Sequence, residues 1–128
     1  MLGSNAGAPA RANAASGYLV EGPAGSVLLD AGPGTFMRLA ERIEPADLDG
    51  VVISHRHVDH CSDLFGLYAY LAYEHGGDVR IPVVVPTGVA QAMAAFVGAG
   101  TDHAFHRVFE FEEIEPGSTT YLGGYRVV

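Results

Sequence analysis

The stretch VVISHRHVDHC, residues 51–61, places three histidines and an aspartate within six residues, directly after an apolar run. Four of the six side chains from His55 to His60 are of types that bind metal ions well. A polar surface loop is the alternative interpretation, and one or two histidines alone would favour it. Three histidines together with an aspartate favour a metal site.

The spacing of these residues favours two neighbouring cations. In an extended segment side chains alternate between two faces, so His55 and His57 project to the same side while Arg56 projects away. By the same alternation Asp59 projects to the side of His55 and His57, and His60 follows at the turn into the next helix. We therefore expect His55 and His57 to converge on one cation, with Asp59 and His60 facing a second. Imidazole and carboxylate ligands together suit zinc, with manganese or iron as alternatives.

The position of the motif in the chain supports this interpretation. Residues 50–53 are a continuous run rich in β-branched side chains, which is typical of a strand covered on both faces. A ligand loop at the carboxyl end of such a strand, leading into a helix, is where open α/β sheets place their sites.

The composition limits the kind of protein. A chain of 128 residues is long enough for one domain with a real core. Fifteen acidic residues against seven Lys and Arg give a net charge of -8, which argues against a broad surface for nucleic acid. The single cysteine, Cys61, excludes an internal disulfide. Without a signal peptide pattern or a long apolar run, we expect a cytoplasmic protein with no membrane partner.

The remaining apolar runs predict an α/β order without internal repeats. Residues 1–15 show no periodicity and are predicted to be a loop. Helices are predicted from Thr35 to about residue 43, from Ser62 or Asp63 to the glycines at 76 and 77, and over 88–97, with Thr35 as the N-cap of the first. Strands are predicted over 16–21 and 26–30 as a hairpin, then over 50–53, 81–85, 107–111, 119–122 and 125–128.

The motif from His55 to His60 resembles the H-x-H-x-D-H signature of the metallo-β-lactamase-fold hydrolases. The surrounding chain resembles the opening half of the ribonuclease Z-like branch, which includes bacterial cyclic-nucleotide phosphodiesterases, through LGSNAGAPARANAASGYLVE, VLLDAGPGTFMRL and IEPADLDGVVISHRHVDHCSDLFGL. The resemblance extends at least over residues 2–85. It implies that residues 1–128 are one incomplete domain, the N-terminal half of an αββα sandwich, with a mixed sheet and helices on its outer face.

The resemblance also implies roles for single residues. His55 and His57 would bind the first of two zinc ions, and Asp59 and His60 would bind the second. Asp59 is in addition the candidate catalytic residue of this set. Asp30 matches the family's strand-end aspartate, which orients a ligand or its loop without touching the metal. A turn-forming aspartate is the alternative interpretation of Asp30.

The family supplies its remaining ligands from further along the chain: a histidine, a bridging aspartate and a last histidine. The other histidines here are His75, expected at a helix C-terminus, and His103 and His106, expected in a loop before a strand. None of them has the strand-end context of the family's ligands. We therefore expect only part of a metal site, completed by a missing C-terminal segment or by a second copy in a homodimer.

The function that the resemblance implies is hydrolysis of a phosphodiester by a metal-activated bridging water. A cyclic nucleotide or another small phosphodiester is favoured over nucleic acid, because the chain is acidic and Pro33 stands where the ribonuclease Z pattern has a glutamate between two glycines. Three alternatives stay open: a tRNA 3′-processing endonuclease, a lactone or ester hydrolase of the same fold, and a non-catalytic half-domain that needs a partner segment.

Two other residues of this stretch, Cys61 and Arg56, are expected to have structural or solvent-facing roles. Cys61 is expected to be a buried small side chain rather than a ligand or nucleophile. Arg56, which points away from the metals by its parity, is expected to face solvent or a salt-bridge partner.

Overall fold

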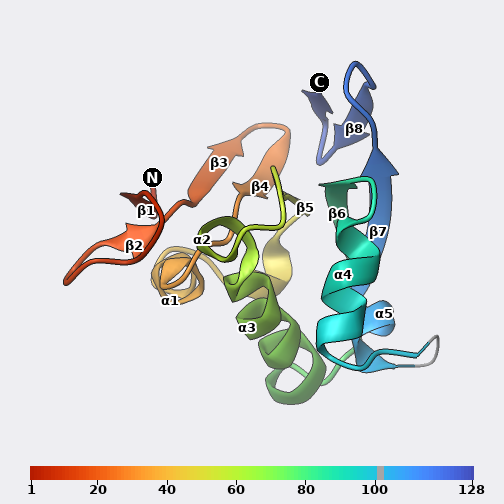
Figure 1. Cartoon of the computed structure of the whole chain (residues 1–128), viewed down its shortest axis with the longest axis horizontal. Helices are drawn as coiled ribbons and strands as arrows, with labels where there is room; N and C mark the ends of the chain where they lie inside the picture. The colour runs from red at the N-terminus through yellow and green to blue at the C-terminus, as the bar shows by residue number, and fades with distance from the viewer. Residues whose placement is uncertain (101–102) are drawn as a thin grey trace.

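A five-stranded mixed sheet organises the chain, in a computed structural model that describes residues 1–100 and 103–128 (Figure 1). The strand order is β3-β4-β5-β6-β7, with β3 and β4 antiparallel and the other neighbours parallel. The bounds are β3 (Tyr18–Gly22), β4 (Gly25–Leu29), β5 (Gly50–Val52), β6 (Ile81–Pro86) and β7 (Phe109–Ile114). The predicted hairpin and the buried strands at 50–53 and 81–85 are confirmed.

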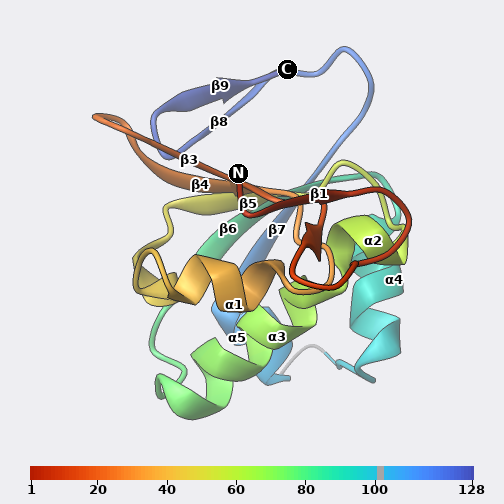
Figure 2. The same cartoon turned by 90° about the vertical axis from the view of Figure 1, so that its left-hand side faces the viewer.

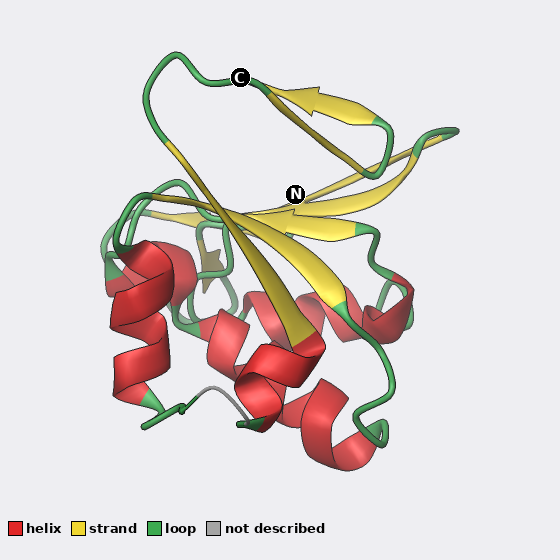
Figure 3. Cartoon of the chain, turned by 90° about the vertical axis from the view of Figure 1, so that its right-hand side faces the viewer, coloured by secondary structure: helices red, strands yellow, loops and turns green. Residues whose placement is uncertain are grey.

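The helices cover one face of this sheet, as Figures 2 and 3 show. Side chains from both layers, such as Leu39, Leu64, Val83 and Phe105, form one large core between them. The α-helices are α1 (Thr35–Ala40), α2 (Val58–Cys61), α3 (Asp63–Ala69), α4 (Val89–Phe96) and α5 (Ala104–Val108), with a 3-10 turn η1 (Pro45–Asp47) and a π-helical turn η2 (Tyr70–Glu74). The predicted mixed sheet with helices on its outer face is confirmed.

A hairpin of β8 (Thr120–Leu122) and β9 (Tyr125–Val127) lies over the opposite face of the sheet (Figure 3). Side chains alternate along a strand, so Val83 faces the helices while Val84 faces the hairpin, where it meets Val27 and Leu122 in a second, smaller core. Gly50 allows this approach, because a Cβ at that position would overlap the side chain of Leu122. The second face is therefore covered only in part.

The prediction of a loop over residues 1–15 is wrong for two short segments. Strands β1 (Gly3–Asn5) and β2 (Ala14–Ala15) pair in parallel beside the main sheet. Backbone groups fix them: the nitrogen of Leu2 donates to the oxygen of Gly17 at 2.9 Å, and the nitrogen of Ala15 donates to the oxygen of Pro33 at 3.0 Å. Such pairing leaves no side-chain periodicity, so the sequence pattern did not reveal it.

The first predicted helix differs in its start and its end. Gly34 is the N-cap, whereas Thr35 lies fully buried inside α1, where its hydroxyl donates to the oxygen of Gly32 at 2.7 Å. Thr35 as the N-cap was therefore wrong, because its hydroxyl binds a carbonyl instead of the helix's free N–H groups. Helix α1 also ends at Ala40, short of residue 43.

The prediction of a strand over 107–111 is wrong at its start. Residues up to Val108 belong to α5, and β7 begins at Phe109 and runs on to Ile114. The other predicted helices and the last two strands are present with small shifts of their ends. Among residues 1–100 and 103–128, no helix has the length and apolar character needed to cross a membrane.

The hairpin packing yields a stability prediction. Leu122→Ala should lower the free energy of unfolding by about 2–3 kcal/mol, because it leaves a cavity against Val27 and Val84. Tyr121→Thr is the matched control: its side chain is 71% exposed and should change the value by less than about 0.5 kcal/mol. Urea unfolding followed by circular dichroism measures both. Equal effects would mean that the hairpin does not pack on the sheet.

Candidate metal-binding site

Three histidine rings gather at the carboxyl end of β5. The ring centres of His55 and His57 lie 4.7 Å apart, and those of His55 and His60 lie 4.1 Å apart. His57 is exposed, while His55 and His60 are half-buried. The side chains that the sequence singled out are therefore brought together at the edge of the sheet where it placed them.

The reasoning that placed Asp59 by strand parity is wrong. Residues Val58–Cys61 form the helical turn α2, so the extended geometry ends at His57. Asp59 and His60 reach the cluster because the first turn of α2 directs them there. The nitrogen of His60 donates to the oxygen of His57 at 2.9 Å, which closes this turn.

Asp30 connects the cluster to two strand ends. Its backbone is left-handed, with φ of 58°, a conformation that aspartate tolerates better than most residues. Its Oδ1 accepts from the nitrogen of Ser54 at 2.7 Å, and its Oδ2 accepts from Oγ of Ser54 at 2.9 Å. The same Oδ2 lies 2.7 Å from Nδ1 of His60. One carboxylate therefore joins the end of β4, the end of β5 and the ring of His60.

Asp59 is held by a contact that spans 52 residues of sequence. Its Oδ2 accepts from the nitrogen of Gly7 at 3.0 Å. This hydrogen bond is the main reason why the pKa of Asp59 is lowered from its usual value, with burial acting in the opposite direction. The same Oδ2 lies 3.2 Å from Nε2 of His60. The carboxylate is thus ionised at neutral pH and directed at the imidazole.

In this conformation the four side chains lie close together, but they do not form a complete metal site. Within the described residues, no three side chains of His, Cys, Asp or Glu are arranged so that they could hold a metal ion. Three imidazoles and an ionised carboxylate are nevertheless the donor types that zinc takes in proteins. The chemistry of the donors fits the metal that the sequence suggested.

Backbone contacts fix the position of α2. The nitrogen of Ala31 donates to the oxygen of His60, and the nitrogen of Asp63 donates to the oxygen of Ala31, each at 2.7 Å. Gly32 packs directly on the same turn, because a Cβ there would overlap the carbonyl oxygen of Asp59. The segment after β4 therefore serves as the support on which the ligand-bearing turn rests.

Sequence reasoning missed the roles of two residues that support the cluster, Gly7 and Ser54, and of Asp63, which joins two neighbouring helices. Gly7 and Ser54 act through the contacts described above, and Ser54 Oγ also lies 2.9 Å from Nδ1 of His55. Asp63 accepts a hydrogen bond from the nitrogen of Phe36 at 2.9 Å and so ties α3 to the start of α1. Burial raises the pKa of Asp63, opposed by backbone N–H groups. Of these residues, Ser54 alone could have been noticed in the sequence, because it stands between a predicted strand and a histidine.

The other histidines lie elsewhere. His75 ends η2, as predicted, with its Nδ1 3.3 Å from Asp78. The loop prediction for His103 and His106 is wrong, because His103 caps α5 by accepting from the nitrogen of Phe105 at 3.1 Å and His106 lies within that helix. These histidines have their own local contacts, away from the motif.

Cys61 is buried, as expected, with its Sγ donating to the oxygen of Arg56 at 3.3 Å. Burial raises the pKa of this thiol, with the carboxylates of Asp30 and Asp59 adding to the effect. A thiol that resists ionisation is a poor metal ligand and nucleophile. Cys61 therefore acts as a small core residue.

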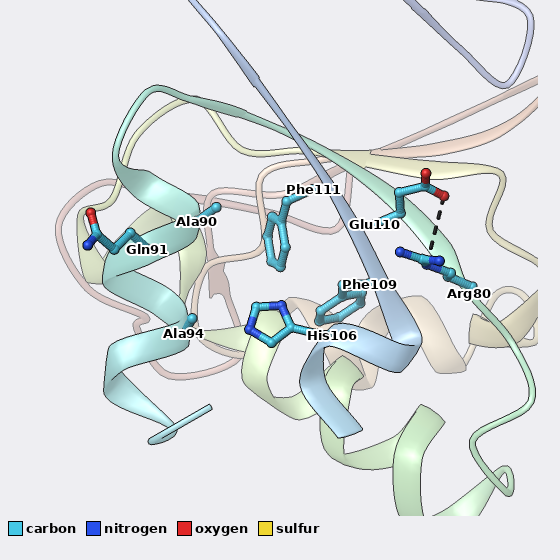
Figure 4. Close-up of a pocket in the computed structure, with 8 residues that line it drawn as sticks. All are labelled: Arg80, Ala90, Gln91, Ala94, His106, Phe109, Glu110 and Phe111. Carbon is cyan, nitrogen blue, oxygen red and sulfur yellow. Dashed lines mark ion pairs between the residues drawn. The ribbon is translucent and has the colours of Figure 1, made fainter. Parts of the chain in front are cut away.

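A cavity of about 530 Å³ between α4 and β7 does not coincide with the histidine cluster. Figure 4 shows His106 and Phe111 facing it, and Arg80 at its edge, with its Nε 3.8 Å from Glu110. None of the motif residues lines this hollow. The convergence of donor side chains, and not the size of a cavity, marks the candidate site.

The support under α2 leads to a paired prediction. Gly32→Ala should destabilise the chain by about 1–3 kcal/mol, because the added methyl group must displace the carbonyl of Asp59. Gly66→Ala is the control: it lies in α3, where a Cβ meets only ordinary contacts, and should stabilise by about 0.5–1 kcal/mol. Urea unfolding gives both values, and amide exchange should accelerate at His60 only in the first variant. Unchanged exchange there would contradict the proposed support.

Sequence comparison connects this arrangement to known proteins. A sequence profile of the beta-lactamase superfamily domain matches residues 26–128. Ribonuclease Z from Methanopyrus kandleri is 30% identical over 128 residues, which cover 99% of this chain and 43% of that protein. A probable metallo-hydrolase, YhfI from Bacillus subtilis, is 38% identical over 64 residues, half of this chain and 26% of that protein.

Solved structures share the fold. The crystal structure of the metallo-beta-lactamase fold protein YhfI from Bacillus subtilis superimposes with a TM-score of 0.74 at 23% identity, over 94% of this chain and 47% of that one. The short form of human tRNase Z superimposes with a TM-score of 0.67 at 22% identity, over 88% and 43%. This chain thus spans less than half the length of these relatives. The profile match over most of its length shows that the chain belongs to the beta-lactamase superfamily, with the metallo-β-lactamase fold.

Proposed function

We propose that this chain carries the metal-binding motif of a metal-dependent hydrolase that cleaves phosphodiesters. One observation supports the metal most directly: Nε2 of His60 and Oδ2 of Asp59 face each other at 3.2 Å. A carboxylate can only accept a hydrogen bond, so the contact between Nδ1 of His60 and Oδ2 of Asp30 assigns the proton to Nδ1, and a neutral ring then has a lone pair at Nε2. Two electron-rich atoms this close require a proton or a cation between them.

The same distance suits zinc. Zinc takes nitrogen and oxygen ligands at 2.0–2.1 Å in tetrahedral geometry, which puts two of its ligand atoms about 3.3 Å apart. We propose that Asp59 and His60 hold one ion and that His55 and His57 hold the other, with manganese or iron as alternatives to zinc. The rest of each coordination shell would come from a further segment or a second copy of the chain.

The residues have distinct tasks in this proposal. When bound, a pair of metal ions lowers the pKa of a water molecule and stabilises negative charge on phosphoryl oxygens. Asp30 fixes the tautomer and the orientation of His60 through Nδ1. Asp59, the proposed catalytic residue, stays ionised through its bond from Gly7 and can accept a hydrogen bond from the attacking water.

The proposed substrate is a cyclic nucleotide or another small phosphodiester. The net charge of -8 leaves little electrostatic attraction for a long polyanion, and Pro33 replaces the glutamate of the ribonuclease Z pattern. The second candidate is tRNA 3′ processing, which the match to ribonuclease Z over 99% of this chain favours. Lactone or ester hydrolysis, and a non-catalytic half-domain, are the remaining outcomes to be tested.

The metal assignment predicts the behaviour of a histidine variant. The purified chain should take up about two zinc ions when equilibrated with the metal. His57→Ala should weaken zinc binding at least about tenfold without changing the unfolding midpoint, because the exposed His57 contributes little to the core. His75→Ala, a change in an exposed histidine outside the cluster, should leave zinc binding unchanged. Competition with a chromophoric chelator measures both, and equal affinity in all three proteins would refute the ligand assignment.

The substrate assignment predicts an order of rates. The zinc-loaded chain, tested as a monomer and at concentrations that favour dimers, should hydrolyse bis-(p-nitrophenyl) phosphate and 3′,5′-cyclic AMP faster than it trims a tRNA precursor. His57→Ala, purified in parallel, reports any contaminating activity. Cleavage of the tRNA precursor alone would favour the second candidate, and turnover of p-nitrophenyl acetate alone would favour an esterase. Zinc binding without any turnover would identify a non-catalytic half-domain.

A further inference from the structure

A second cavity, of about 300 Å³, lies between the helices that flank the motif. Its walls come from α2, α3 and α4, which lie close together in Figure 2. Most of the lining is apolar, with Phe65 and Phe96 stacked at 4.7 Å between ring centres and Met93 buried beside them. Phe96 is 77% exposed, so this wall opens to solvent. The volume and lining are those of a small-ligand site.

A buried hydroxyl in this cavity has no partner. Ser62 is one of the residues that line the cavity, and its Oγ is shielded from solvent and makes no hydrogen bond with any residue that the structure describes. Buried polar groups are nearly always paired, because desolvation without a replacement bond costs free energy. A ligand that offers a hydrogen-bonding atom at this depth would remove that cost.

A positive charge stands at the same cavity. The exposed guanidinium of Arg56 lines it and forms no hydrogen bond or ion pair with the residues in 1–100 and 103–128. The backbone of Arg56 is fixed, since its oxygen accepts from Sγ of Cys61 at 3.3 Å. Although the chain carries a net charge of -8, this guanidinium provides a local positive charge that can bind an anion next to the apolar wall of the cavity.

We propose that this cavity binds a small amphipathic carboxylate with a short aliphatic chain, for which octanoate serves as the probe. The chain packs against Phe65, Met93 and Phe96, the carboxylate pairs with Arg56, and the hydroxyl of Ser62 donates to a carboxylate oxygen. A single guanidinium matches a monoanion better than a phosphate dianion, and the mostly apolar lining excludes a sugar or a nucleotide. The ligand would contact α2, the turn that carries Asp59 and His60, without using either residue.

This proposal does not depend on metal binding, so its test uses the metal-free chain. Octanoate is titrated while the methyl signal of Met93 is followed by NMR, and binding should saturate at about one equivalent. Arg56→Gln should weaken octanoate binding about tenfold, the value of one charge-assisted pair, while 1-octanol binds equally to both proteins. Arg42→Gln, an equal charge change at an exposed site outside this cavity, should have no effect.

A second variant tests the location. Ala92→Phe places a ring in the cavity from α4 and should abolish the binding of octanoate and 1-octanol alike, with a thermal melt reporting whether the fold is retained. Absence of a saturable Met93 shift up to the concentration at which octanoate forms micelles would overturn the proposal. Equal weakening by Arg56→Gln and Arg42→Gln would overturn it too, because the anion would then respond only to net charge.

Discussion

The hydrogen bonds of the Asp30 carboxylate are the constraint on which the candidate site depends. They join the ends of two parallel strands, β4 and β5, to the ring of His60. Parallel pairing puts both carboxyl ends at the same edge of the sheet, so a side chain at one end reaches the backbone at the other. Without this carboxylate, the nitrogen of Ser54 and Nδ1 of His60 would lose their partner together, and the imidazole would be free to turn.

The site is consequently a product of tertiary structure as much as of the motif. The three histidines and Asp59 come from one short stretch, but Gly7 from the N-terminal segment binds Asp59, and Gly32 supports the turn that carries it. The face of the sheet under the helices supplies the rigid platform, because its core is large and fully buried. An architecture of this kind positions donor side chains before any ligand binds, which reduces the free-energy cost of assembling a site.

The sequence predicted what depends on local pattern. Strands β5 and β6 were recognisable because their apolar, β-branched runs are continuous, and the histidines because their types and spacing are unusual. The turn α2 was missed because its four residues are too few to show helical periodicity. Helix α5 was missed for a related reason: Phe105 and Val108 fit a helix face, yet they directly precede a strand of similar composition.

No pattern in the sequence indicated the contacts between distant segments. The bond from Gly7 to Asp59 uses a backbone nitrogen, which every residue except proline offers, and the β1-β2 pair is likewise made by backbone groups alone. The left-handed conformation of Asp30 follows from its surroundings rather than from its residue type, although aspartate tolerates it. The position of Asp30 was therefore predictable, but its three hydrogen bonds were not.

The central claim is that the histidine cluster oriented by Asp30 binds a divalent cation, and an anomalous difference map from crystals equilibrated with zinc tests it most directly. The account predicts a peak between Nε2 of His60 and Oδ2 of Asp59, about 2.0–2.1 Å from each atom, and a second peak at His55 and His57. A map without a peak at either place, while zinc appears elsewhere on the molecule, would contradict it.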